Sequence, residues 1–187
     1  MTPDKTASQH ETFRVLLKAM SRPGSIQHFI QPSNPEEHPL LRLLDCILDN
    51  EVCICGIGSE AQELITQLHQ QEGCRLGEIA EADFVIVSNG TSAGQLASAK
   101  VGTPDYPDSS VTVVYLIEQL TPEGGTVMLT GPGIKETVSP VFSGLALDEF
   151  RQLQTINSSF PLGMDAIFVD RSGQCCCIPR STVIQVN

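Results

Sequence analysis

The sequence has no tryptophan, few aromatic residues and few basic ones. Aromatic residues make up 5% of its 187 residues, and 11 Lys and Arg face 22 Asp and Glu, which gives a net charge of −11. A field of this sign repels nucleic acids and anionic membranes, so we expect neither as a partner. No apolar run approaches the ~20 residues of a membrane span, and the polar start MTPDKTASQHE shows no signal peptide, so a cytoplasmic protein is expected.

Sequence signatures of catalysis and metal binding are missing as well. No GxSxG, Walker A or HExxH motif occurs, and the four histidines have no ligand spacing. The seven cysteines contain no CxxC pair, and outside an oxidising compartment they are expected to be reduced and mostly buried. In a strand, Cys175 and Cys177 share one face and Cys176 takes the other, which leaves too few sulfurs for a tetrahedral zinc site. The sequence thus predicts no catalytic residue, no metal and no cofactor.

Apolar periodicity predicts a single α/β domain over residues 1–187. A helix is expected over 9–21, with one buried stripe made of Phe13, Leu16, Leu17 and Met20. Further helices are expected at 40–48, at 59–72 with Ser59 as the N-cap, at 91–100 and at 147–159. Strands are expected at 52–58, 83–88, 111–117, 125–131 and 181–187, with a hairpin over 166–179. Fully apolar strands alternating with helices indicate a parallel or mixed sheet covered on both faces.

Two glycine-rich turns raise the question of phosphate binding. GIGSEA, residues 56–61, follows a strand and opens a helix as a dinucleotide-binding turn does. That fingerprint requires an acid at the end of the next strand, whereas Asp83 stands at its start. LTGPGI, residues 129–134, places Gly131 and Gly133 around Pro132. Its backbone amides can form an anion nest, or its glycines can serve a tight turn and close packing, and the sequence leaves both open.

An acidic and a basic residue flank the predicted hairpin. Asp165 comes about seven residues before the turn at 171–173, and Arg180 about seven residues after it. Strand pairing therefore predicts a contact between Asp165 and Arg180. The contact is either a structural ion pair or a way of holding an arginine that faces an anion.

Four segments together resemble one known family. FRVLLKAMSRPG (13–24), LTGPGI (129–134), FPLGMD (160–165) and IPRST (178–182) occur in the order and spacing of PhnH, the H subunit of the bacterial carbon–phosphorus lyase machinery for phosphonate use. The likeness extends from about residue 9 to 186, and between 50 and 125 it rests mainly on pattern. The run of Cys175, Cys176 and Cys177 is not part of the family's motifs and receives no role.

The resemblance implies a fold and a function. The fold would be a three-layer α/β/α arrangement with a mixed sheet, similar to the large domain of type I pyridoxal-phosphate transferases but without that cofactor. The chain would pair with itself as a dimer and join PhnG, PhnI and PhnJ type subunits. With G, I and L subunits it would support transfer of ribose triphosphate from ATP to methylphosphonate, whereas cleavage of the carbon–phosphorus bond belongs to PhnJ. No activity is then expected of the isolated chain; the alternative is a free-standing nucleotide-binding transferase that uses GIGSEA or LTGPGI.

The family motifs also imply which residues form a surface for a ligand or a partner. The expected surface comprises Arg14, Arg22, Gly131, Gly133, Asp165 and Arg180. Guanidinium groups bind phosphate through two parallel hydrogen bonds. The expected ligand is therefore an anionic small molecule, such as a phosphonate or an ATP-derived phosphate.

Overall fold

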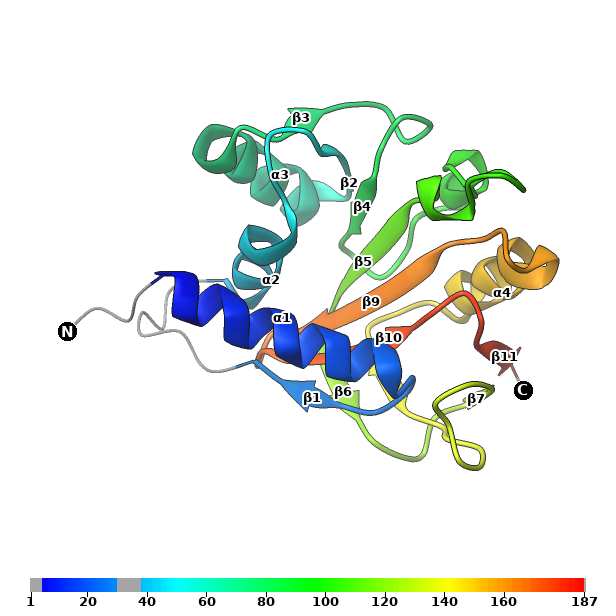
Figure 1. Cartoon of the computed structure of the whole chain (residues 1–187). Helices are drawn as coiled ribbons and strands as arrows, with labels where there is room; N and C mark the ends of the chain where they lie inside the picture. The colour runs from blue at the N-terminus through cyan, green and yellow to red at the C-terminus, as the bar shows by residue number, and fades with distance from the viewer. Residues whose placement is uncertain (1–4, 30–37, 187) are drawn as a thin grey trace.

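A seven-stranded sheet forms the centre of the structure (Figure 1). The computed structural model describes residues 5–29 and 38–186, and the strands of this sheet follow the order β1-β10-β9-β5-β4-β2-β3. Their bounds are β1 Gln27–His28, β2 Cys53–Ile57, β3 Arg75–Leu76, β4 Phe84–Val87, β5 Thr112–Ile117, β9 Asp165–Asp170 and β10 Gln174–Ile178. The neighbouring strands β3, β2, β4, β5 and β9 pair in parallel. Strand β10 pairs antiparallel with β9 and with β1. The prediction of an α/β fold with a mixed sheet is confirmed.

Different elements cover the two faces of this sheet. One face carries α1 (Lys5–Ser21), α2 (Pro39–Ile47) and α3 (Ser59–Glu72). The other carries α4 (Leu147–Ile156) and two small antiparallel sheets, which pair β6 (Gln119–Thr121) with β8 (Val141–Ser143) and β7 (Val127–Thr130) with β11 (Val183–Val186). Along β9, Ile167 and Val169 join the core under α1, α2 and α3, whereas Phe168 stacks on Phe150 of α4. Apolar side chains therefore fill both faces, as the apolar strands predicted.

The buried face of α1 differs from the predicted stripe. Leu16 is buried as expected, but its buried neighbours are Thr12 and Ala19, whereas Phe13 and Leu17 are 44% and 51% exposed. The small Ala19 lets the helix lie close to the sheet, and the Thr12 hydroxyl donates to the Ser8 carbonyl oxygen at 3.0 Å, so its burial leaves no unpaired donor. The helix is thus rotated about its axis relative to the prediction, and two large apolar side chains face outward.

The predicted helix at 91–100 is only a short 3-10 turn, η1 (Gln95–Ser98). Ala93 (φ 50°) and Gly94 (φ 82°) both adopt the left-handed conformation, which interrupts a right-handed helix. The predicted strands at 125–131 and 181–187 both form, as β7 and β11, but they pair with each other outside the central sheet. Their meeting brings the LTGPGI turn next to the IPRST segment.

The cysteines of β10 alternate across the sheet as predicted. Cys175 and Cys177 join the core under α1, α2 and α3, and Cys176 joins the core under α4. Burial raises the pKa of all three thiols, that of Cys175 to about 12. Within 5–29 and 38–186, no group of three or more His, Cys, Asp or Glu side chains is placed to hold a metal ion. None of the helices in these ranges has the length and apolar character needed to cross a bilayer.

Candidate functional site

Three of the family motifs meet at one end of the molecule. The SRPG turn follows α1, the LTGPGI turn follows β7, and PRST lies between β10 and β11. A Cβ atom on Gly133 would lie 2.5 Å from the Ser21 carbonyl oxygen, and one on Gly131 would lie 3.2 Å from the Ser181 carbonyl oxygen. The Gly24 amide donates to the Cys177 carbonyl oxygen at 3.1 Å. Segments more than a hundred residues apart in the sequence are therefore packed backbone to backbone.

The LTGPGI segment forms a tight turn. The Ile134 amide donates to the Gly131 carbonyl oxygen at 3.1 Å, and Gly133 has φ +82° after Pro132. Proline at the second position and a left-handed glycine at the third define a type II turn. The interpretation of LTGPGI as a turn with close packing is confirmed, and its use as an anion nest stays a prediction.

The predicted Asp165–Arg180 contact is confirmed. The guanidinium donates to Asp165 Oδ2 at 2.6 Å through NH2 and to Oδ1 at 3.3 Å through Nε, while the Arg180 backbone amide donates to Oδ1 at 2.8 Å. NH1 donates to the Pro107 carbonyl oxygen at 2.6 Å, and both side chains of the pair are less than a fifth exposed. Arg180 is thus held rigidly between β9 and the loop at Pro107, with its charge compensated by Asp165.

A cleft of about 480 Å³ opens beside Arg180. We call it the motif cleft, and it is lined by Pro132, Gln154, Asn157, Ser158, Phe160, Arg180, Ser181, Thr182, Val183 and Ile184. Phe160 is 64% exposed and Val183 is 53% exposed, so its rim is apolar. The Thr182 hydroxyl is buried and makes no hydrogen bond within the described residues. The cleft combines apolar contact area with an unused polar group, which suits a partner side chain or a small ligand.

Arg14 and Arg22 lie apart from the motif cleft. Arg22 is exposed in the SRPG turn that packs on Gly133, so it borders the gathered motifs. Arg14 lies on α1 and lines a separate groove of about 590 Å³. We call this the basic groove, and it is lined by Arg14, Val15, Lys18, Ile26, Gln27 and His28. The structure therefore separates the six expected residues: Arg14 lines the basic groove, Arg22 lies in the SRPG turn, and Gly131, Gly133, Asp165 and Arg180 lie in or beside the motif cleft.

Two residues of the basic groove were not predicted from the sequence. Lys18 follows Arg14 at the helical spacing i, i+4, which is a signal that the sequence carries. His28 lies on β1, a two-residue strand that exists because it pairs with β10, so no local pattern marks it. The pairing of β1 with β10 places His28 across the groove from α1.

At the GIGSEA turn, the Ser88 side chain already occupies an amide at the start of α3. Ser88 Oγ accepts a hydrogen bond from the Ala61 amide at 3.1 Å and donates to the Ile57 carbonyl oxygen at 3.4 Å. The N-cap residue is therefore Gly58, not the predicted Ser59, and Ser88 from outside the helix supplies the side-chain acceptor for its first turn. Gly58 (φ 96°) lets the backbone pass directly against Ser88. Because a phosphate bound at this turn would compete with Ser88 for the Ala61 amide, the dinucleotide interpretation is not favoured.

A buried carboxylate that the sequence did not reveal fixes the loop after β4. Glu149 of α4 accepts hydrogen bonds from the Ser92 amide at 2.8 Å, from the Ser92 and Thr91 hydroxyls at 3.0 and 3.1 Å, and from the Tyr115 hydroxyl at 2.9 Å. Burial and the neighbouring Glu149 raise the pKa of Tyr115 well above its ordinary value. Donors from the 91–92 loop and from β5 satisfy the carboxylate, so its role is to hold these two segments to α4.

Comparisons with known proteins show the family to which the chain belongs. Residues 2–185 match the family described as bacterial phosphonate metabolism protein (PhnH). The chain is 28% identical over 179 residues to a protein of Stutzerimonas stutzeri named as C-P lyase subunit protein HtxG, an alignment that covers 96% of this chain and 87% of that protein. It is 27% identical over 190 aligned positions to alpha-D-ribose 1-methylphosphonate 5-triphosphate synthase subunit PhnH of Rhizobium meliloti (strain 1021), covering 97% of this chain and 92% of that protein. The chain belongs to the PhnH family.

Proposed function

We propose that this protein is a non-autonomous subunit of a carbon–phosphorus lyase core complex in phosphonate catabolism. The observation that carries the proposal is the family match over residues 2–185, together with one relative named as a C-P lyase subunit and another named as a subunit of alpha-D-ribose 1-methylphosphonate 5-triphosphate synthase. In this role the chain works with G, I and L subunits in the transfer of ribose triphosphate from ATP to methylphosphonate. It assembles with G, I and J type subunits in the cytoplasm as a single domain, pairs with itself, and has a fold related to type I pyridoxal-phosphate transferases without using their cofactor.

The motif cleft supports a docking role. Most of the hydrogen-bonding capacity of Arg180 is already used by Asp165 and Pro107, so the cleft offers little free cationic charge. Its rim instead presents Phe160 and Val183, and an exposed aromatic ring beside an aliphatic side chain is typical of an interface anchor. We therefore assign the motif cleft to contact with a partner subunit.

Co-purification tests this assignment. The tagged chain, co-expressed with G, I and J type subunits from one genome, is expected to retain them through size-exclusion chromatography. Phe160→Asp is expected to release them, because a charge replaces an apolar anchor on an exposed position and leaves the fold intact. Leu76→Asp, at a 46% exposed position on the far edge strand β3, is the matched control and is expected to behave as wild type. Failure of the wild-type chain to retain any partner contradicts the proposed function, and equal retention by Phe160→Asp contradicts the role of the cleft.

The alternative of a free-standing transferase is tested separately. It requires nucleotide turnover by the isolated chain through GIGSEA or LTGPGI, and the first of these is occupied by Ser88. Incubation of the purified chain with ATP and methylphosphonate is expected to release no adenine above the uncatalysed rate. Multiple turnovers by the isolated chain would replace the subunit proposal with this alternative.

A further inference from the structure

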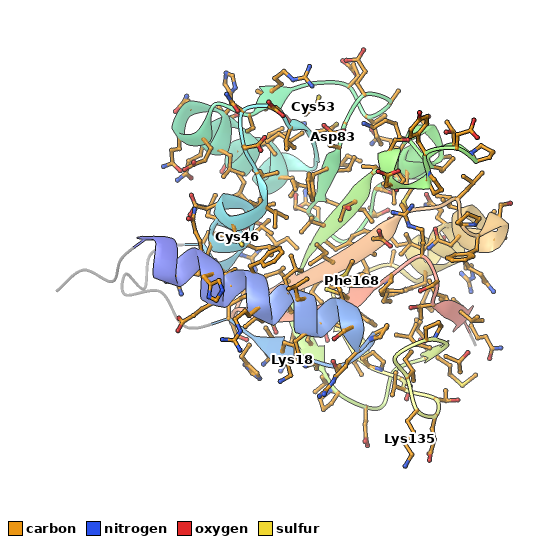
Figure 2. The ribbon with its side chains drawn as sticks, viewed as in Figure 1. Lys18, Cys46, Cys53, Asp83, Lys135 and Phe168 are labelled. Carbon is orange, nitrogen blue, oxygen red and sulfur yellow. The ribbon has the colours of Figure 1, made fainter. Side chains whose placement is uncertain are left out.

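The unpaired basic side chains of this acidic protein are concentrated in one region. Other described basic residues hydrogen-bond or pair, as Lys100 does with Asp83 and Arg171 with Glu60. Within the described residues, the basic side chains that form neither a hydrogen bond nor an ion pair are Arg14, Lys18, Arg22 and Lys135. All four lie on α1 or on the two turns packed against its C-terminal end, and Figure 2 shows Lys18 and Lys135 toward the same side of the molecule.

The basic groove contains the densest part of this charge. Arg14 and Lys18 lie one helical turn apart on α1 and form one wall, and His28 and Gln27 of β1 line the other side. Both α1 side chains are exposed, and Glu11, one turn before Arg14, makes no ion pair with it in the described structure. Like charges at i, i+4 on a helix repel each other, so the pair is destabilising unless an anion lies between or beside them.

We infer that the basic groove binds a small molecule that carries a phosphate or phosphonate group. An oxyanion in the groove receives two parallel hydrogen bonds from the Arg14 guanidinium and a further one from the Lys18 ammonium, and it lies within reach of the His28 ring. The groove of about 590 Å³ is large enough to hold more than a single phosphate group. Val15 and Ile26 supply an apolar floor for the rest of the ligand.

Stabilisation of the helix dipole does not account for this cluster. Basic residues in the last turn of a helix interact favourably with its C-terminal carbonyl groups, and Lys18 lies in that turn. Arg14 lies a full turn earlier, and His28 belongs to a strand. The inference rests on the proposed function only for the source of the ligand, since phosphonate metabolism supplies both phosphonates and nucleotide phosphates.

Titration of the isolated full-length chain tests the inference. The imidazole signals of His28 are followed by nuclear magnetic resonance while inorganic phosphate, methylphosphonate or ATP is added at constant ionic strength. At least one of the three is expected to shift these signals saturably, and comparison of the three identifies the source of the anion. Arg14→Gln combined with Lys18→Gln is expected to weaken binding by about tenfold or more, because each lost charged hydrogen bond contributes strongly to affinity.

A matched control distinguishes binding in the basic groove from a general effect of the protein's net charge. Lys135→Gln combined with Arg151→Gln removes the same charge outside the groove and is expected to change the affinity by less than about twofold, because neither side chain lines the groove and salt screens exposed charges. The inference is wrong if no titrant saturates the His28 shift below about 10 mM, or if both double variants weaken binding equally. The inference is also wrong if Arg14→Gln combined with Lys18→Gln releases partner subunits without weakening binding of any titrant, because the groove then contacts an acidic protein surface. Partner retention by the wild-type chain is unaffected by any of these outcomes, so this inference and the proposed function fail separately.

Discussion

Replacement of Gly133 by alanine tests whether the motif turns are packed as closely as the structure shows. Gly133 has φ +82°, and an added Cβ would lie 2.5 Å from the Ser21 carbonyl oxygen and 2.8 Å from Cδ of Pro23. The first contact is with backbone and the second with a rigid ring, so neither neighbour can move without shifting the SRPG turn. We expect Gly133→Ala to destabilise the protein while leaving its helices and strands formed.

The expected loss of stability in Gly133→Ala has two parts. A non-glycine residue in the left-handed region costs about 1–2 kcal/mol. Forcing a methyl group into filled space costs a further ~1–3 kcal/mol. Together they lower the free energy of unfolding by about 2–5 kcal/mol, a large fraction of the ~5–15 kcal/mol of a typical domain. Urea unfolding followed by far-UV circular dichroism measures the change, since the chain has no tryptophan to serve as a fluorescence probe.

Gly94 provides a matched control for this measurement. It also has φ +82°, but an added Cβ there meets no atom within 4 Å. Gly94→Ala therefore incurs the backbone cost alone, and the effect of alanine on the unfolded chain cancels between the two variants. We expect Gly133→Ala to be less stable than Gly94→Ala by about 1–3 kcal/mol. A difference below about 0.5 kcal/mol would refute the close packing of LTGPGI on the end of α1.

Three further predictions concern the ionisable groups. Asp165→Asn is expected to lower the free energy of unfolding by about 1–3 kcal/mol because it leaves Arg180 largely buried without its counter-ion, whereas Asp148→Asn, in a mostly exposed pair, should cost less than about 0.5 kcal/mol; equal losses in urea unfolding would contradict this. Burial raises the pKa of Asp83, but hydrogen bonds from its lysine partner and from a backbone amide outweigh that effect and lower the pKa below 3.8, so the stabilisation is present at neutral pH and is lost as pH falls through the lowered pKa. The difference in Tm between wild type and Asp83→Asn should accordingly shrink toward zero in acid. A difference in Tm that persists in acid would contradict the lowered pKa of Asp83. Cys175–Cys177 should react with a thiol reagent at pH 8 only as fast as the protein unfolds, and immediate labelling of these three residues in mass spectra would contradict their burial.

Much of the fold followed from local periodicity. The apolar runs at 83–88 and 111–117 become β4 and β5 because buried parallel strands require apolar side chains on both faces. The positions of Asp165 and Arg180 about the hairpin turn predicted their contact because strand pairing fixes which residues face each other. These features depend on neighbours along the chain or across a single turn.

Other features could not be predicted from the sequence because they depend on packing between distant segments. The apolar positions of α1 form more than one stripe, and the small size of Ala19 where the helix meets the sheet decided which stripe was buried. Ser88 caps α3 from the end of another strand, which no capping pattern within the helix indicates. The same holds for His28, which reaches the basic groove through the pairing of β1 with β10.

The sequence by itself determined the α/β pattern, the alternation of Cys175–Cys177 across the sheet and the family to which the chain belongs. These properties are carried by residue type and spacing, which the linear order preserves. Only the tertiary structure decided that the motifs divide between the motif cleft and the basic groove. Which surfaces come together depends on how side-chain volumes fill the space between segments far apart in the chain, and that is settled only when the whole core is packed.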